Sequence, residues 1–100
     1  MEGRPPSPIV LADVVRFTLH DHDVRDVRVC GSWDDWSAAG LPARRVEPAL
    51  FEAIMRSPAP ARYAYKFLLD EVRWIDDPDN PHKEQDGFGR LNSILDLRTR

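Results

Sequence analysis

The amino-acid sequence predicts an all-β sandwich of about seven short strands. Short stretches of alternating apolar and polar residues recur along the chain, and segments rich in Gly, Pro, Asp and Asn separate them. No stretch shows a helical repeat of apolar residues long enough to form a helix. The one segment with helical propensity, residues 50–55 (LFEAIM), lies between Pro48 and Pro58, which favours a strand there.

The first two strands are predicted before residue 31. Apolar and polar residues alternate from Ile9 to His20, and the alternation resumes from Val24 to Cys30. The polar residues 20–23 (HDHD) between them are typical of a hairpin turn. Residues 33–36 (WDDW) are predicted as a loop, and residues 37–44, which contain Gly40 and Pro42, show no helical periodicity long enough to form a helix.

The central strand is predicted within residues 62–74 (RYAYKFLLDEVRW). The residues of its buried face occupy every second position: Tyr63, Tyr65, Phe67 and Leu69. Lys66 then projects from the opposite face of a firmly anchored strand. Trp74 follows the turn-like residues 70–71 at the end of this strand.

Two more strands are predicted around this centre, over Leu50–Arg56 and over Arg90–Leu97. In the last strand, Leu91 and Leu95 share one face and Asn92 lies on the other. Residues 76–89, rich in Asp, Pro, Asn and Gly, are predicted as a loop.

Length and composition narrow the possible functions. One hundred residues fit a single domain, which we place at residues 9–100 behind a flexible, Pro-rich leader at residues 1–8. With a net charge of −3, the chain lacks the excess of basic residues that is typical of proteins that bind nucleic acid. The sequence shows neither a membrane span nor a secretory signal, and its one cysteine, Cys30, is typical of a reducing compartment. We therefore expect a cytoplasmic protein.

Four residues form a candidate carbohydrate-binding surface: Trp36, Lys66, Trp74 and Asn92. Glucose polymers present apolar C–H faces surrounded by hydroxyl groups. A flat indole covers such a face and loses little entropy, because it has few rotatable bonds. An amide can both donate to and accept from neighbouring hydroxyls, whereas an ammonium only donates.

Each of these residues also has a plainer interpretation. A tryptophan in a small β-domain more often belongs to the core, and we assign that role to Trp33, which follows a strand end directly. Trp36 and Trp74 stand among polar residues, which favours exposure. Lys66 alone would be read as a solvated charge, and Asn92 alone as an edge or turn residue.

Other chemistries find less support in the sequence. His20 and His22 would share a strand face but lack a third ligand nearby, so we favour a solvated turn. Residues 76–80 (DDPDN) do not complete a calcium loop. The adjacent Asp34 and Asp35 offer no cleft for glycoside hydrolysis. Cys30 is interpreted as a small, partly buried strand residue, and no cofactor is predicted.

Four motifs resemble one known family of modules. They are GSWDDW (residues 31–36), YKFLLD (65–70), WIDDP (74–78) and GRLNSIL (89–95), in matching order and spacing. Together they resemble the glycogen-binding domain of the AMP-activated protein kinase β subunit. They are equally similar to the early-set N-terminal domains of isoamylases and glycogen-branching enzymes, the family-48 carbohydrate-binding modules. The resemblance covers residues 10–97.

This resemblance implies an immunoglobulin-like sandwich, an α-glucan ligand and a set of site residues. It places the two stacking tryptophans at Trp36 and Trp74, the lysine at Lys66 and the asparagine at Asn92. It also places a loop residue that flanks or enters the glucan near Phe88, with Arg90 two positions on.

The sequence departs from the family pattern at two turns. The usual Asp-Gly turn after the central strand is Asp70-Glu71 here, and Ala61 stands where a glycine is expected. If those turns require a positive φ, a non-glycine residue costs about 1 kcal/mol in each. Trp74 follows the first of these turns, so the direction in which its side chain projects depends on the backbone conformation of that turn.

The sequence therefore predicts a non-catalytic module that binds an α-1,4-linked glucan such as glycogen or a maltooligosaccharide. A glycogen-metabolising enzyme is a candidate protein partner. The alternative is an interaction or structural domain that keeps the early-set fold without sugar binding, with Trp36 and Trp74 buried or covered by a partner chain.

Overall fold

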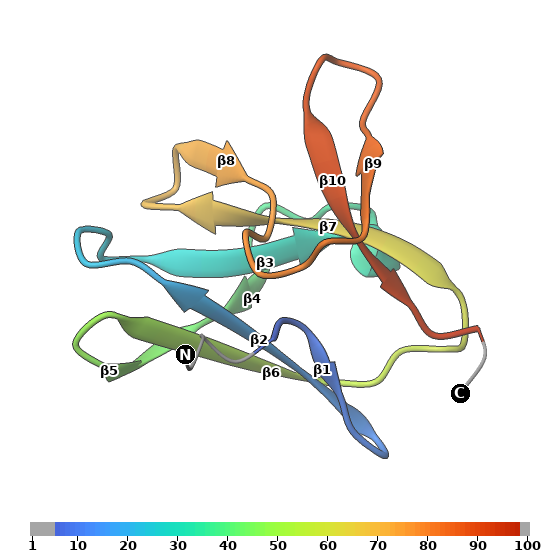
Figure 1. The fold of residues 1–100 in the computed structure, drawn as a ribbon, viewed down its shortest axis with the longest axis horizontal. Coiled ribbons are helices and arrows are strands. Elements are labelled where there is room, and N and C mark those ends of the chain that lie inside the picture. Colours follow the sequence, from blue (N-terminus) through green and yellow to red (C-terminus); the bar gives the residue numbers. More distant parts are fainter. Residues whose placement is uncertain (1–5, 99–100) are drawn as a thin grey trace.

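The computed structural model describes residues 6–98 and confirms the predicted all-β, immunoglobulin-like sandwich (Figure 1). In chain order the elements are β1 (Ile9–Val10), β2 (Val14–His20), β3 (Val27–Gly31), the 3₁₀ turn η1 (Ser32–Asp34), β4 (Leu41–Pro42), β5 (Arg44–Glu47), β6 (Leu50–Arg56), β7 (Arg62–Leu69), β8 (Arg73–Ile75), β9 (Lys83–Gln85) and β10 (Leu91–Asp96). One sheet has the order β1-β2-β6-β5. The other has the order β4-β3-β7-β10-β9, and β8 also pairs with β7.

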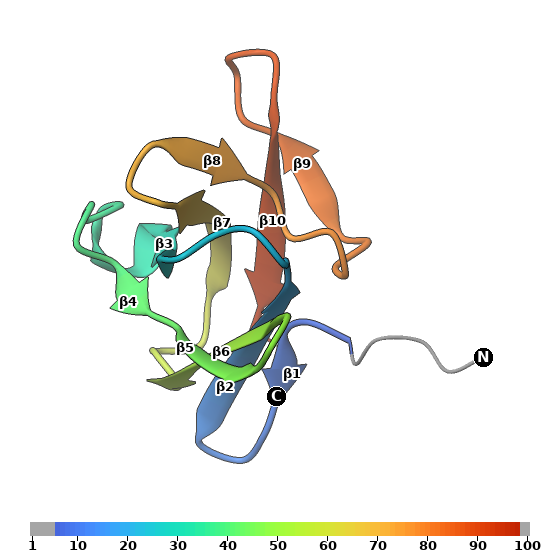
Figure 2. The ribbon, with the colours of Figure 1, turned by 90° about the vertical axis from the view of Figure 1, so that its left-hand side faces the viewer.

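The core lies between β2 and β6 on one side and β3 and β7 on the other, and Figure 2 shows these strands as two layers. The alternation of apolar and polar residues in β2 and β7 accounts for this core, because every second side chain of a strand points inward. On β2 and β7 these buried residues are Val15, Phe17, Leu19, Tyr65, Phe67 and Leu69. The rings of Phe17 and Tyr65 meet edge to face across the sandwich, with centroids 4.9 Å apart.

Trp33 has the core role that its position predicts. It is partly buried and packs against the core cluster. Its ring centroid lies 5.9 Å from that of Phe17 and 6.2 Å from that of Tyr65. This indole therefore closes the core at the end of β3, where η1 begins.

Several element boundaries differ from the sequence-based expectation. The stretch predicted as one strand from Ile9 to His20 bends at residues 11–13 and forms the β1–β2 hairpin, in which Leu11 N–H donates to Val14 O at 2.9 Å. Residues 76–89, predicted as a loop, contain β9. Residues 37–44, for which the sequence excluded only a helix, contain β4 and the start of β5. These additions are edge strands, whose exposed side chains need no alternation because backbone pairing alone defines them.

The first described residues contact the sandwich. Residues 1–5 of the predicted leader lie outside the described part of the chain, and Ser7, near the end of that leader, is buried. Its Oγ accepts the backbone N–H of Thr18 at 3.2 Å. The two residues stand opposite each other when the Ile9–Arg16 register is continued, so Ser7 supplies an acceptor to β2 where β1 no longer does.

A buried polar network holds the segment between β8 and β9. Asp77 is fully buried. Its Oδ2 accepts the hydroxyl of Tyr65 at 2.7 Å, and its N–H donates to Ser93 Oγ at 2.7 Å. Asn80 Nδ2 donates to both Tyr65 Oη (3.1 Å) and Ile94 O (3.0 Å). Burial raises the pKa of the Asp77 carboxyl and, more strongly, that of the Tyr65 hydroxyl. The network ties this segment to β7 and β10.

The turn between β7 and β8 has the strained backbone that its sequence predicts. Asp70 and Glu71 have φ of 51° and 65°, and Val72 N–H donates to Leu69 O at 3.0 Å. A positive φ at both central residues is what a type I′ turn requires, and glycine is the usual second residue. Ala61, by contrast, does not have a positive φ. Of the two departures from the family pattern, only Glu71 therefore carries a backbone cost.

Replacing Glu71 with glycine is expected to stabilise the fold by about 0.5 kcal/mol. The left-handed conformation costs a non-glycine residue about 1–2 kcal/mol, and the extra freedom of glycine in the unfolded chain offsets part of the gain. The exposed contact of Glu71 with Arg28, 3.1 Å long, adds little. Urea denaturation measures the change. Ala61→Gly is the matched control, and we expect it to destabilise by about 0.5–1 kcal/mol. Two shifts of the same sign would contradict this account.

Candidate functional site

Trp74 stands on the outer face of the six-stranded sheet because of how β8 pairs. Trp74 lies opposite Leu68 of β7, so the two side chains project from the same face, away from the core. The turn at residues 69–72 sets this register. Trp74 is 36% exposed, which leaves it open to a ligand.

Trp36 reaches the same face from the loop after η1. Asp35 and Trp36 both have φ of 60°, a left-handed conformation that is unusual for a bulky residue. The loop is held by hydrogen bonds at both ends: Trp36 N–H donates to Gly31 O at 2.9 Å, and Ser37 N–H donates to Asp34 Oδ1 at 3.2 Å. Trp36 is partly exposed. The loop thus fixes an indole beside β7 at a backbone conformation that side chains normally avoid.

Lys66 stands where one edge of β7 changes partner. The first half of β7, up to Tyr65, pairs with β10, and its second half, from Phe67, pairs with β8. Lys66 falls between the two pairings, and β10 and β9 rise away from the sheet beyond it (Figure 1). Its side chain points to the outer face, as the alternation of β7 predicts, and it is 13% exposed.

Asp86 joins Lys66 to the tip of the β9–β10 hairpin. The two side chains form an ion pair, with Nζ and Oδ2 2.7 Å apart. The other oxygen, Oδ1, accepts the N–H groups of Phe88 at 2.7 Å and Arg90 at 3.2 Å. Gly87 and Gly89, with φ of 87° and 86°, allow the sharp turn on either side of Phe88. The carboxylate therefore fixes both the shape of the tip and its place above Lys66.

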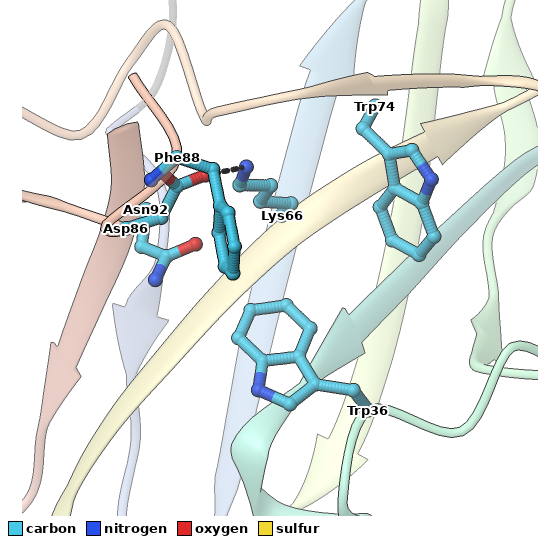
Figure 3. A pocket seen from close by; sticks show the side chains of 6 residues that line it. All are labelled: Trp36, Lys66, Trp74, Asp86, Phe88 and Asn92. Carbon is cyan, nitrogen blue, oxygen red and sulfur yellow. Dashed lines mark hydrogen bonds and ion pairs between the residues drawn. The ribbon is translucent and has the colours of Figure 1, made fainter. Parts of the chain in front are cut away.

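Five of the six residues predicted for the site line one depression on this face, and Asp86 is the sixth residue of its wall. The volume of this depression is about 370 Å³. Figure 3 shows the rings of Trp36, Trp74 and Phe88 around it, from three separate parts of the chain, with Lys66 and Asn92 beside Phe88. Phe88 is 90% exposed. Neither tryptophan is buried in the interior, and the two indoles face the same depression.

Arg90, the remaining predicted residue, belongs to a second depression next to the first. The second depression has a volume of about 420 Å³, and it shares Lys66 and Trp74 with the first. Its other lining residues are Ile75, Asp76, Gly89, Arg90 and Leu91. Arg90 therefore shares a depression with Trp74 but does not line the one that Trp36 and Phe88 enclose.

Asp86 is the site residue that the sequence analysis missed. An aspartate directly before Gly87-Phe88-Gly89 is a usual acceptor for the N–H groups of a following turn, so its local role was open to prediction. Its contact with Lys66 was not, because the two residues lie 20 positions apart and meet only through the pairing of β7, β10 and β9.

The Lys66–Asp86 contact has a measurable signature. The hydrogen bond from Lys66, helped by that from the Phe88 N–H, lowers the pKa of Asp86 from 3.8 to about 2. Because the folded pKa is the lower one, the carboxylate contributes to stability above about pH 4, and the contribution is lost as pH falls through about 2. We expect an NMR titration of the Asp86 carboxyl to show this midpoint.

Lys66→Met is the matched variant for that titration. It removes the ammonium group and keeps an unbranched apolar chain, so we expect the pKa of Asp86 to rise toward 3.8 while the backbone N–H bonds still hold it somewhat lower. A pKa near 3.8 in the unaltered protein would show that the ion pair does not form in solution.

The other candidate sites of the sequence take structural places. Cys30 is fully buried, and burial raises the pKa of its thiol, which disfavours the nucleophilic thiolate. Asp34 accepts a backbone N–H in the Trp36 loop. Within residues 6–98, no group of three or more His, Cys, Asp or Glu side chains is placed to hold a metal ion. In the same range, no helix has the length and apolar character needed to cross a membrane.

Comparison with protein families finds one matching model. The family is described as the glycogen recognition site of AMP-activated protein kinase, and it matches residues 15–100. A search of curated proteins finds no match.

Solved structures share the fold at low sequence identity. The enterobactin esterase from Shigella flexneri, in the presence of 2,3-di-hydroxy-N-benzoyl-serine, has a TM-score of 0.72 and 18% identity, over 92% of this chain and 32% of the esterase. The ferric enterobactin esterase from Salmonella typhimurium has a TM-score of 0.68 and 16% identity, over 84% and 31%. A putative alpha amylase from Salmonella typhimurium has a TM-score of 0.68 and 20% identity, over 92% and 15%. The chain thus spans about a third of the length of the esterases and less of the amylase.

Proposed function

The chain belongs to the family of the glycogen recognition site of AMP-activated protein kinase, and from this premise we propose that it binds an α-1,4-linked glucan in the depression between Trp36, Trp74 and Phe88. The family supports a non-catalytic, glycogen-binding role. One observation carries the finer proposal: three partly or fully exposed aromatic rings from separate elements surround one open depression.

Each side chain has a definite task in this proposal. The two indoles stack on the apolar faces of successive glucose units, and the ring of Phe88 flanks the chain from the side of the hairpin. Asn92 offers a donor and an acceptor to neighbouring hydroxyls. Lys66 gives one hydrogen bond to Asp86 and keeps the rest of its donors for the ligand.

Binding is expected to be weak for a single site. An open surface with few stacking contacts should give about −4 to −6 kcal/mol, which corresponds to dissociation constants from about a millimolar to tens of micromolar. A polymer such as glycogen offers many equivalent sites, and a tether to an enzyme would raise the effective concentration further. We therefore propose that residues 9–100 form a targeting module that places a glycogen-metabolising enzyme on its substrate in the cytoplasm.

Titration with maltoheptaose or β-cyclodextrin, followed by tryptophan fluorescence, tests the proposal. We expect a saturable change, because two of the three tryptophans line the depression. A β-1,4-linked oligosaccharide of equal length is the control ligand and should give a smaller response. Absence of any response at about 10 mM maltoheptaose, tenfold above the weakest expected constant, would instead favour the alternative of a protein-interaction domain.

A further inference from the structure

The second depression has a setting of its own in the fold. It lies in the fork where β8 and the β9–β10 hairpin separate along β7, with Ile75 and Asp76 from the β8 side and residues 89–91 from the β10 side. Lys66 and Trp74 line both depressions. A ligand seated on Trp74 in the first depression is therefore next to the second.

Arg90 is the charged group that remains without a partner in this fork. The ammonium of Lys66 is paired with Asp86 at 2.7 Å, and the carboxylate of Asp76 is paired with Lys83 at 2.6 Å. Among residues 6–98, no ion pair or side-chain hydrogen bond engages the guanidinium of Arg90, although its backbone N–H is bonded to Asp86. The charges within these two ion pairs cancel, so the positive charge of Arg90 remains in the fork, in a chain whose net charge is −3.

We propose that this second depression is an anion subsite, which takes a phosphate monoester on a glucose unit of the glucan bound in the first depression. The inference rests on the proposed glucan binding and adds a preference for phosphorylated chains. A planar guanidinium donates two parallel hydrogen bonds to phosphate oxygens, a geometry that neutral sugar hydroxyls do not match.

The surroundings of Arg90 fit a substituted sugar better than a free ion. Trp74, Ile75 and Leu91 give the depression, whose lining is otherwise polar, an apolar part that suits the C–H face of the sugar ring. Asp76 also lines the depression, and its pairing with Lys83 weakens its repulsion of an incoming phosphate. The ester is thus placed between a sugar-binding wall and a single cation.

The test compares maltoheptaose with maltoheptaose that carries one 6-phosphate. Because Arg90 is exposed, we expect the phosphorylated ligand to bind only about two- to fivefold more tightly, as for an exposed ion pair, and the preference to shrink in about 0.5 M NaCl. Arg90→Gln should reduce the ratio of the two affinities to about one. Arg56→Gln removes the same charge from an exposed position on β6, in the opposite sheet, and should keep the ratio.

The outcomes separate this inference from the proposed function. Equal affinities for the two ligands, or a preference that survives Arg90→Gln, would overturn the anion subsite while leaving glucan binding intact. Failure of both ligands to bind would overturn the proposed function and the subsite with it. A third arm adds inorganic phosphate to unsubstituted maltoheptaose; if this mixture reproduces the gain, the subsite takes free phosphate rather than an ester.

Discussion

Trp74→Ala and Trp36→Ala are each expected to weaken maltoheptaose binding at least tenfold, and the double variant should show no measurable binding. Central aromatic side chains usually carry more than about 1.4 kcal/mol of such an interface. Because the whole interaction is expected to be worth only about 4–6 kcal/mol, loss of one indole removes a large share of it. Isothermal titration calorimetry measures the change without relying on the fluorescence of the residues that are removed.

Val72→Ala is the control for these two variants. Val72 is 79% exposed on the turn that precedes β8, and it lines neither depression. Its removal takes away exposed apolar surface near Trp74 without removing a stacking ring, so binding should not change. Unfolding curves of all variants show whether the fold is kept. If both tryptophan variants bind as tightly as the unaltered chain, the proposed stacking surface is wrong.

Asp77→Ala is expected to have the largest effect on stability, a loss of about 2–3 kcal/mol. The change leaves the buried hydroxyl of Tyr65 without its acceptor, which costs about 1–3 kcal/mol, and it also removes the hydrogen bond that the Asp79 N–H donates to Asp77. Relief of the desolvation of the buried carboxylate offsets part of this loss, because burial already disfavours its charged form. Chemical denaturation measures the difference.

The neighbouring Asp76 provides the comparison for Asp77. Asp76 forms a partly exposed ion pair with Lys83, and such pairs are worth less than about 1 kcal/mol. Asp76→Ala should therefore destabilise the fold much less than Asp77→Ala, although the two aspartates are adjacent in sequence. Equal losses from the two variants would show that the buried network does not anchor the segment between β8 and β9.

The fold could be predicted from the sequence wherever a strand has one buried face. The alternation in β2, β6 and β7 results from that burial, so their positions and the roles of residues such as Phe17 and Tyr65 followed from the pattern. β9 (KEQ) and β5 (RRVE) are edge strands with mostly exposed side chains, and backbone pairing leaves no comparable mark on their sequence.

The candidate site was predicted in part for a similar reason. The outward position of Lys66 follows from the period of β7, and the turn strain at Glu71 follows from its place in the Asp-Gly position of related turns. The distribution of residues between two depressions did not follow. This distribution depends on the change of strand partner along β7 at Lys66 and on the ion pair by which Asp86 holds the hairpin tip above Lys66. Both are long-range contacts that leave no local pattern in the sequence.

Because the backbone at Trp36 is left-handed, selection for stability and selection for glucan binding should favour different residues at position 36. The conformation costs every folded copy of the protein about 1 kcal/mol, with or without a ligand, and glycine would adopt it freely. In a library of all amino acids at position 36, screening for heat resistance should enrich glycine and asparagine, while retention on immobilised amylose should enrich tryptophan. The variants that heat resistance enriches should not be retained on immobilised amylose.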